Sequence, residues 1–178
     1  MTERRQNEWA DLENKALELL AYCSPPESDK RPASAVLRLW HYPSFGVYTS
    51  WVVYRISPAG EELEYIVEEK VWDRPSDAQR MFDPLVGSQH PLKFSVSTTI
   101  STRSTVLLNS KVVQMLEELS SLRFRPFCDD GSFGLDGETF GVETFGFQKT
   151  LIKWRCDGPA ELQELARWAQ KARSQLAG

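Results

Sequence analysis

Two histidines and three cysteines are the residues of this sequence best suited to metal binding or nucleophilic catalysis. They are His41, His90, Cys23, Cys128 and Cys156. None of them stands in a CxxC, HExxH or related metal-ligand spacing, and no cysteine has a histidine close to it in the chain. The sequence therefore predicts neither a metal nor another cofactor, and it favours a non-catalytic binding protein over an enzyme.

One catalytic alternative stays open at His41 and Cys156. His41 lies in a strand-like run between Trp40 and Tyr42, where a packed or rim position is the commoner role of a histidine. Cys156 is expected at the end of a strand, just before a helix, and a helix N-terminus lowers the pKa of a thiol. A buried, inert thiol is the commoner case. The alternative is a small enzyme or small-ligand-binding protein with its site near these two residues.

Acidic residues are concentrated in two short segments, residues 61–69 and 129–143, the second of which contains no lysine or arginine. Clusters of one sign attract partners of opposite charge. Trp168 lies at the edge of the apolar stripe of the last predicted helix, and an exposed tryptophan there would anchor an interface. We predict a partner-binding surface made of Glu61, Glu62, Glu64, Asp129, Asp130, Asp136, Glu138, Glu143 and Trp168. The alternative is a solvated strand edge and an ordinary polar hairpin.

The overall charge argues against nucleic acid as a direct ligand. The 178 residues carry 21 basic and 25 acidic side chains, for a formal net charge of −4. The basic residues are scattered along the chain, whereas phosphate binding needs them concentrated. The six tryptophans are expected mostly in the core, and Trp154 is of interest because it lies between Lys153 and Arg155. The expected partner is another protein with a basic surface, and the oligomeric state stays open.

No part of the sequence predicts a membrane segment or a secretory signal. No stretch approaches the ~18 continuous apolar residues that a membrane helix needs. Residues 1–8 carry charges of both signs instead of the apolar core of a signal peptide. Widely spaced cysteines in odd number are typical of reduced thiols rather than of a disulfide framework. These features predict a cytoplasmic protein that does not bind a membrane.

The length fits a single domain that spans residues 1–178. Apolar residues recur at three- and four-residue steps in residues 1–22, which predicts an amphipathic N-terminal helix. Prolines among small and charged residues predict a linker in residues 23–34. The remaining residues, 35–178, are predicted to form the body of the domain.

Short strand-like runs dominate this body, and they come in adjacent groups rather than in strict alternation with helices. The predicted strands are residues 35–42, 47–56, 63–72, 93–102, 139–147 and 149–156. The predicted helices are a short one with a Ser76–Gln79 capping box, one over residues 109–124, and one that begins at Pro159. The pattern predicts an α+β fold, a mainly antiparallel sheet of about five to six strands with about three longer helices packed on one face.

The C-terminal part of the chain contains a recognisable order of motifs. Leu135-Asp136-Gly137-Glu138-Thr139-Phe140 precedes a β-rich stretch that ends in Ile152-Lys153-Trp154, and Pro159, Leu162 and Leu165 follow in a predicted helix. This order resembles the tail of small bacterial cytosolic proteins that include the immunity proteins of polymorphic-toxin and contact-dependent systems. The resemblance covers residues 135–176 and departs from the family pattern at Leu162, where a tryptophan is common. It implies a hairpin opened by an Asp-Gly turn and a helix that closes the sheet.

The same resemblance implies a protein that neutralises a cognate toxin by covering its active site. The acidic segments would then face a basic, nuclease-like toxin. A further alternative is a scaffold subunit of a larger complex, in which the N-terminal helix on its proline-rich linker docks onto the other subunits.

Overall fold

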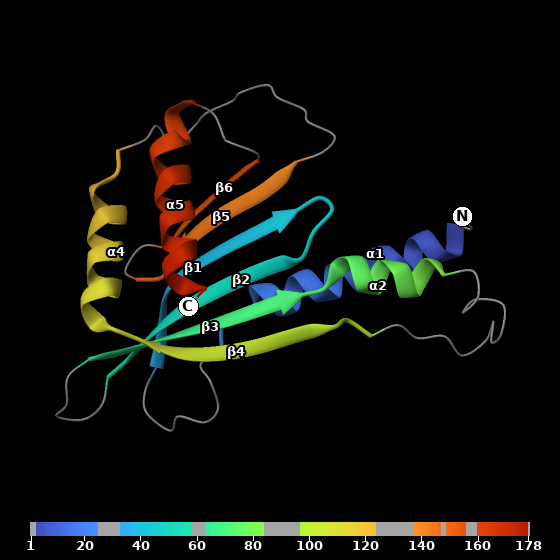
Figure 1. Ribbon diagram of the computed structural model, residues 1–178, viewed down its shortest axis with the longest axis horizontal. Helices are drawn as coiled ribbons and strands as arrows, with labels where there is room; N and C mark the ends of the chain where they lie inside the picture. Colours follow the sequence, from blue (N-terminus) through green and yellow to red (C-terminus); the bar gives the residue numbers. More distant parts are fainter. Residues whose placement is uncertain are drawn as a thin grey trace.

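The sheet of this protein has six antiparallel strands in the order β4-β3-β2-β1-β5-β6 (Figure 1). The strands are β1 (Ala33–Pro43), β2 (Tyr48–Ile56), β3 (Glu64–Trp72), β4 (Ile100–Leu107), β5 (Glu138–Thr144) and β6 (Thr150–Arg155). The helices are α1 (Glu3–Ala21), α2 (Arg74–Phe82), α4 (Asn109–Ser121) and α5 (Gln163–Leu176), and the short 3-10 helix η1 (Ala160–Leu162) precedes α5. The structure is a computed structural model that describes residues 3–24, 33–57, 63–83, 97–123, 137–146, 149–155 and 160–177. The predicted α+β class and antiparallel sheet are confirmed.

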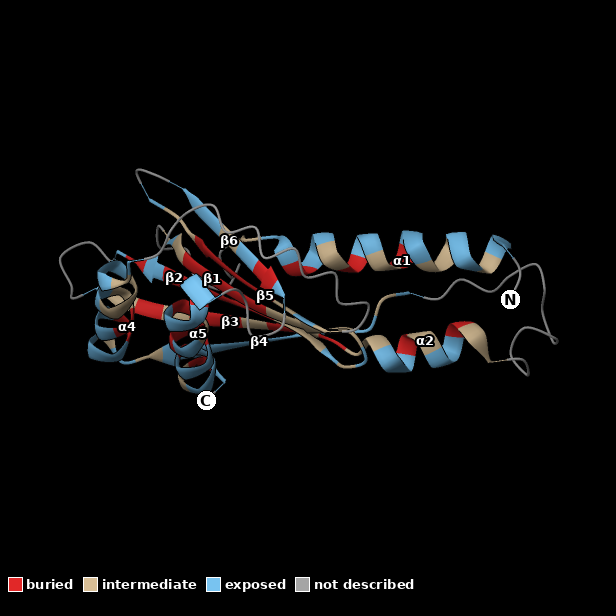
Figure 2. Ribbon diagram, turned by 90° about the horizontal axis from the view of Figure 1, so that it is seen from above, coloured by how far each residue is buried: buried red, intermediate tan, exposed pale blue. Residues whose placement is uncertain are grey.

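Successive side chains of each strand point to opposite sides of the sheet, which gives it two faces. On the α4/α5 face, Leu37 and Leu39 of β1 belong to the core that α4 and α5 cover (Figure 1). On the opposite α1 face, β1 carries Arg38 and Trp40, and α1 packs against β2 and β3 (Figures 1 and 2). We expected helices on one face only, and that expectation is wrong. The reason is that β2 is apolar on both sides, with Val52 fully buried on the α1 face.

Each face has its own hydrophobic core. The larger core, under α4 and α5, includes Leu37, Leu39, Trp51, Val53, Val67, Val112, Met115, Val142, Trp154, Leu165, Trp168 and Leu176. The apolar stripe predicted for the last helix is confirmed, because its residues Leu162, Leu165, Ala169, Ala172 and Leu176 are all buried. The smaller core, under α1, joins Leu12, Ala16 and Leu20 to Trp72 and Met81. Each fully buried large apolar side chain contributes about 1.5–3 kcal/mol to folding, so these cores hold the helices on the sheet.

The C-terminal end of α1 is fixed to the sheet by polar contacts. The ammonium of Lys70 donates to the backbone carbonyl oxygens of Tyr22 at 2.6 Å and Leu19 at 3.4 Å. The hydroxyl of Tyr54 donates to the carbonyl oxygen of Ser24 at 2.8 Å. A cation at a helix C-terminus satisfies unpaired carbonyl groups and interacts favourably with the helix dipole. These contacts hold α1 over the β2/β3 side of the α1 face.

Strand β4 begins later in the chain than predicted. Of the predicted strand over residues 93–102, residues 93–96 lie outside the described residues and residues 97–99 are not strand. The pairing of β4 with β3 runs from Ile100 to Leu107, and the side chains between these two residues are exposed. This Ser/Thr-rich strand therefore lacks the alternation of apolar and polar residues from which a strand is recognised.

Helix α2 starts earlier than predicted. Its N-cap is Asp73, whose carboxylate accepts a hydrogen bond from the backbone N–H of Ser76 at 3.1 Å. The prediction that a capping box at Ser76 starts the helix is wrong, because Pro75 occupies the first turn and Asp73 precedes it.

The buried carboxylate of Asp77 connects α2 to the sheet. It accepts hydrogen bonds from the indole N–H of Trp72 and the backbone N–H of Thr99, each at 2.8 Å, and it is paired with Arg80. Burial raises the pKa of Asp77, but the hydrogen bonds from Thr99, Trp72 and Arg80 outweigh burial and lower this pKa below its ordinary value. The ionised form of Asp77 therefore stabilises the folded protein.

Replacing this carboxylate should destabilise the protein in a pH-dependent manner. Asp77→Asn places an amide N–H₂ among donors, and we expect it to lower the free energy of unfolding at pH 7 by about 2–4 kcal/mol. Because the pKa of Asp77 is lower in the folded state than in the unfolded state, its contribution is complete above the unfolded pKa of about 4 and disappears as the pH falls through the folded value. Urea unfolding at pH 7 and pH 3 measures both effects.

The matched control is Asp11→Asn on the exposed surface of α1, which should change the free energy of unfolding by less than about 0.5 kcal/mol. Equal stabilities of Asp77→Asn and Asp11→Asn at pH 7 would show that the carboxylate of Asp77 does not hold α2.

Candidate functional site

Two of the predicted partner-binding residues, Glu143 and Trp168, lie inside the protein, with exposed fractions of 5% and 6%. The indole N–H of Trp168 donates to the carbonyl oxygen of Met115 at 3.1 Å, which ties α5 to α4. The carboxylate of Glu143 lies between the charged groups of Arg38 and Lys149. Neither residue presents its side chain to a partner. The prediction that Glu143 and Trp168 are exposed on a binding surface is therefore wrong.

The other predicted acids do not share one face. Glu138 lies at one end of β1, because it pairs with Pro43, the last residue of that strand. Glu64 lies at the opposite end, because it pairs with Ile56 of β2, and Ile56 pairs with Ala33, the first residue of β1. The two ends of this eleven-residue strand are ten residue steps apart, which is roughly 33 Å at about 3.3 Å per step. Acidic and basic residues are equal in number among the described residues. The described part of the chain therefore has no general acidic excess.

The remaining residues of the predicted surface lie outside the described residues. They are Glu61, Glu62, Asp129, Asp130 and Asp136. The same holds for His90, Cys128 and Cys156. Two proposals therefore stay predictions of the sequence. One is that the acidic segments bind a basic partner, and the other is that a catalytic or ligand-binding site lies near Cys156.

His41 is held by hydrogen bonds at both ring nitrogens. Its Nδ1 lies 3.0 Å from Nη1 of Arg173, and because an arginine only donates, Nδ1 accepts. Its Nε2 therefore carries the proton and donates to Glu138 at 2.9 Å, while the ring stacks on Phe140. Burial is the main cause that lowers the pKa of His41, and the charge of Arg173 lowers it further against the opposing effect of Glu138. His41 joins β1 to α5 and presents no unbound ring nitrogen to a substrate.

The described residues hold no cluster that fits a metal ion. No group of three or more histidine, cysteine, aspartate or glutamate side chains converges in this part of the chain. Cys23 is partly buried, and burial raises the pKa of its thiol, which keeps it protonated and weakly nucleophilic.

A cavity of about 420 Å³ lies on the α1 face, between α1 and the strands β1, β5 and β6. We call it the α1 cleft. Leu17 and Ala21 of α1 form one side, and Lys153 and Arg155 of β6 form the other. Its remaining lining residues are Arg38, Trp40, Tyr42, Ser44, Tyr48, Gly137 and Thr139. Aliphatic, aromatic and cationic side chains therefore meet in one hollow.

The position of Trp40 in this cleft depends on a glycine in the neighbouring strand. Trp40 of β1 pairs with Gly141 of β5, and a Cβ atom at Gly141 would lie 1.8 Å from Cζ2 of the Trp40 ring. Any side chain at Gly141 would displace the indole. The guanidinium of Arg38 lies 4.5 Å from the centre of the same ring, within the range of a cation–π interaction.

Arg38 is the buried cation of the α1 cleft, with 8% of its surface exposed. Its Nη1 donates to Glu143 at 3.1 Å, its Nε donates to the hydroxyl of Ser50 at 3.3 Å, and its Nη2 donates to the hydroxyl of Tyr42 at 3.4 Å. A guanidinium has five N–H groups, so these three bonds do not use its full donor capacity. Glu143 is shared with Lys149, whose Nζ lies 2.6 Å from its other oxygen. One carboxylate is thus paired with two cations.

Lys153 and Arg155 add positive charge that no carboxylate of the described residues balances. Both are exposed, and neither forms an ion pair with any described residue. Both lie on the α1 face, because Lys153 pairs with Gly141 and Arg155 pairs with Thr139. Among the described residues, the α1 face of β1, β5 and β6 therefore carries an excess of positive charge, and its chemistry suits an anionic group.

The sequence did not indicate this site, because the basic residues were judged by their distribution along the whole chain, over which they are scattered. The local signal was the alternation of Lys153 and Arg155 around Trp154, which places two cations on one face of a strand. The prediction of a core role for most tryptophans is consistent with Trp154, which is 4% exposed and lies on the α4/α5 face. The partner of Arg38 lies 105 residues away in the sequence, and no local pattern indicates it.

Comparisons of the chain with protein-family models, with curated proteins and with solved structures found no match. None of the described helices is long and apolar enough to span a membrane. The resemblance of residues 135–176 to immunity proteins stays a prediction.

Proposed function

We propose that this protein is a non-catalytic protein-binding module that recognises an acidic segment of its partner in the α1 cleft. The observation that carries the proposal is that Lys153 and Arg155, which form no ion pair with a described residue, line one cavity together with Arg38. Arg38 shares its carboxylate partner, Glu143, with Lys149. Charge complementarity of this kind guides association and selects partners. The buried guanidinium of Arg38 adds directional N–H donors, which recognise carboxylates more specifically than an exposed ammonium does.

The composition of the α1 cleft favours a protein segment over a nucleic acid. Proteins that bind duplex DNA commonly contact about 6–10 phosphates, whereas this cleft contains three cations. Leu17 and Ala21 of α1 line the cleft and offer apolar contact to a peptide, and the largely buried ring of Trp40 lies beside them. A mixture of apolar contact and local positive charge is typical of a protein interface.

This polarity is opposite to the one predicted from the acidic segments. Of those segments, the described Glu143 is neutralised by Arg38 and Lys149, and Glu138 is bound to His41. A basic partner bound by the acidic residues outside the described part of the chain stays a prediction of the sequence. The geometry supports an acidic partner.

The resemblance of residues 135–176 to immunity proteins implies a toxin as this partner. In that form of the proposal, the toxin supplies the acidic segment, and binding neutralises it. Co-purification of this chain with the product of a neighbouring toxin-like gene tests this form, and the absence of a complex would limit the proposal to a partner of another kind.

Reversing the charge of the two exposed cations of the cleft should weaken its binding of an acidic peptide. We expect the double variant Lys153→Glu/Arg155→Glu to bind a hexaglutamate peptide about tenfold more weakly than the wild type, since the loss of two exposed pairs removes up to about 2 kcal/mol. Isothermal titration calorimetry at low salt measures the dissociation constants. Circular dichroism should show an unchanged fold, because both residues are exposed.

The matched control is Arg55→Glu/Arg167→Glu, which changes the net charge by the same amount at two exposed positions outside the cleft. It should retain most of the affinity for hexaglutamate. Equal losses in both double variants, or no binding of hexaglutamate to the wild type, would contradict the proposal. Titration with inorganic pyrophosphate shows whether a small anion alone is sufficient; tight binding of pyrophosphate without binding of the peptide would contradict a peptide site.

A further inference from the structure

The edge strand β6 offers the unpaired backbone that an added strand needs. β6 pairs with β5 on one side, and no other described strand lies on its outer side. The backbone N–H and C=O groups on such an outer side form a template for another extended chain.

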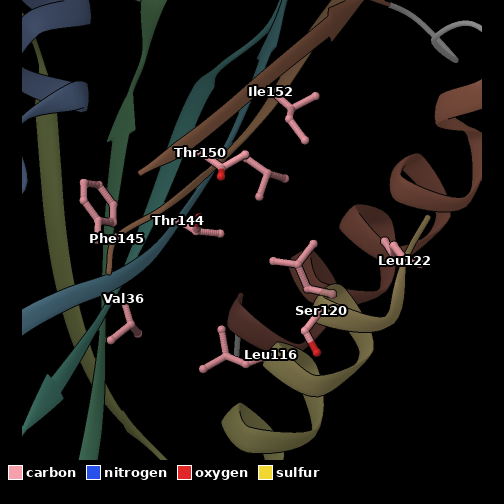
Figure 3. Close-up of a pocket in the computed structure, with 10 residues that line it drawn as sticks. Val36, Leu116, Ser120, Leu122, Thr144, Phe145, Thr150 and Ile152 are labelled. Atoms are coloured by element: carbon pink, nitrogen blue, oxygen red, sulfur yellow. The ribbon is translucent and has the colours of Figure 1, made fainter. Parts of the chain in front are cut away.

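The two faces of β6 open on cavities of different chemistry. On the α1 face, Lys153 and Arg155 line the α1 cleft. On the α4/α5 face, Thr150 and Ile152 line a second cavity of about 470 Å³, which we call the α4 cavity (Figure 3). Figure 3 shows Leu116 of α4 on the side of this cavity opposite the strands. A chain lying along β6 would therefore meet positive charge on one side and apolar surface on the other.

We propose that the acidic segment of the partner adds to β6 as a further antiparallel or parallel strand, in which acidic and apolar residues alternate. This inference rests on the proposed function, because it specifies how the acidic segment binds. Alternate side chains of a strand lie on one face, about 6.6–6.8 Å apart, which is also the separation of Lys153 and Arg155 along β6. Acidic residues at positions i and i+2 then pair with these two cations. The intervening apolar residues point to the side of the α4 cavity.

The other edge strand, β4, lacks this complementarity. Its central residues are serines and threonines, together with Arg103. The guanidinium of Arg103 lies 3.0 Å from Glu69 and donates to the carbonyl oxygen of Ala177 at 2.9 Å. Neither the α1 cleft nor the α4 cavity borders β4. An acidic strand therefore gains charge pairing and a bordering apolar cavity at β6, whereas the one cation of β4, Arg103, is already paired with Glu69.

The decisive experiment compares two peptides of the same composition on the full chain. The alternating peptide Glu-Val-Glu-Val-Glu-Val places its carboxylates on one face of a strand, whereas Glu-Glu-Glu-Val-Val-Val does not. We expect the alternating peptide to bind at least about tenfold more tightly, because only it satisfies both faces of β6 at once. At saturation, amide hydrogen exchange followed by NMR should slow at least about tenfold at the outward N–H groups of β6 and stay unchanged in β4.

Backbone methylation of the peptide separates strand addition from other modes of binding. One version carries N-methyl groups on its three glutamates and the other carries them on its three valines. Because a strand uses alternate N–H groups on each side, one version should keep its affinity and the other should lose at least about tenfold.

The results distinguish the failure of this inference from the failure of the proposed function. Equal binding of the alternating and block peptides, with unchanged exchange in β6 and equal effects of the two methylation patterns, would overturn strand addition. If that binding still depended on Lys153 and Arg155, the α1 cleft would remain the recognition site. Absence of binding by hexaglutamate and by both peptides would overturn the inference and the proposed function together.

Discussion

The buried guanidinium of Arg38 constrains the arrangement of the whole α1 face. A charge in the interior costs several kcal/mol unless it is paired and hydrogen-bonded. Arg38 meets this requirement through Glu143 on β5, Ser50 on β2 and Tyr42 on β1, with Trp40 beneath its guanidinium plane. These partners come from three neighbouring strands. Pairing of the Arg38 guanidinium with Glu143 therefore requires β5 to lie next to β1 in the observed register.

This polar network divides the α1 face into two parts. The apolar stripe of α1 packs mainly against β2 and β3, where Lys70 and Tyr54 hold the end of the helix. The β1, β5 and β6 part carries Arg38, Glu143 and the cations of β6, and the α1 cleft forms at the boundary of the two parts. The position of the cleft follows from where the sheet changes from apolar to charged. The α4/α5 face holds the larger core.

Local patterns were sufficient to predict most elements of the fold. The stripes of α1 and α5 and the first three strands could be predicted because their periodicity is a property of neighbouring residues. β4 was misplaced because both of its faces are exposed, so that its residues show no alternation. The second helical face was missed because a strand such as β2, apolar on both sides, does not indicate by itself that two layers cover it.

The candidate site could not be predicted in the same way, because it consists of long-range pairs. Trp40 occupies its position only because Gly141, from a strand far along the chain, lies beneath it. Glu143 was predicted to be exposed and acidic, but its pairing with Arg38 makes it part of a positive surface. The sign of a surface depends on which charges the fold neutralises. Sequence counts alone do not contain that information.

The proposed function requires that Arg38 takes part in recognition of the acidic segment. The Arg38–Glu143 pair fixes the register of β5 against β1, but we expect it to contribute little to the free energy of unfolding. The double variant Arg38→Met/Glu143→Leu removes both charges without leaving either one unpaired, and such replacements of buried pairs are often neutral or stabilising. Urea unfolding and hexaglutamate titration of this variant test both statements most directly. They predict a free energy of unfolding no more than about 2 kcal/mol below the wild type, the loss that the hydroxyls of Ser50 and Tyr42 would cause, together with at least tenfold weaker binding. Wild-type affinity, or a loss of stability above about 4 kcal/mol, would contradict them.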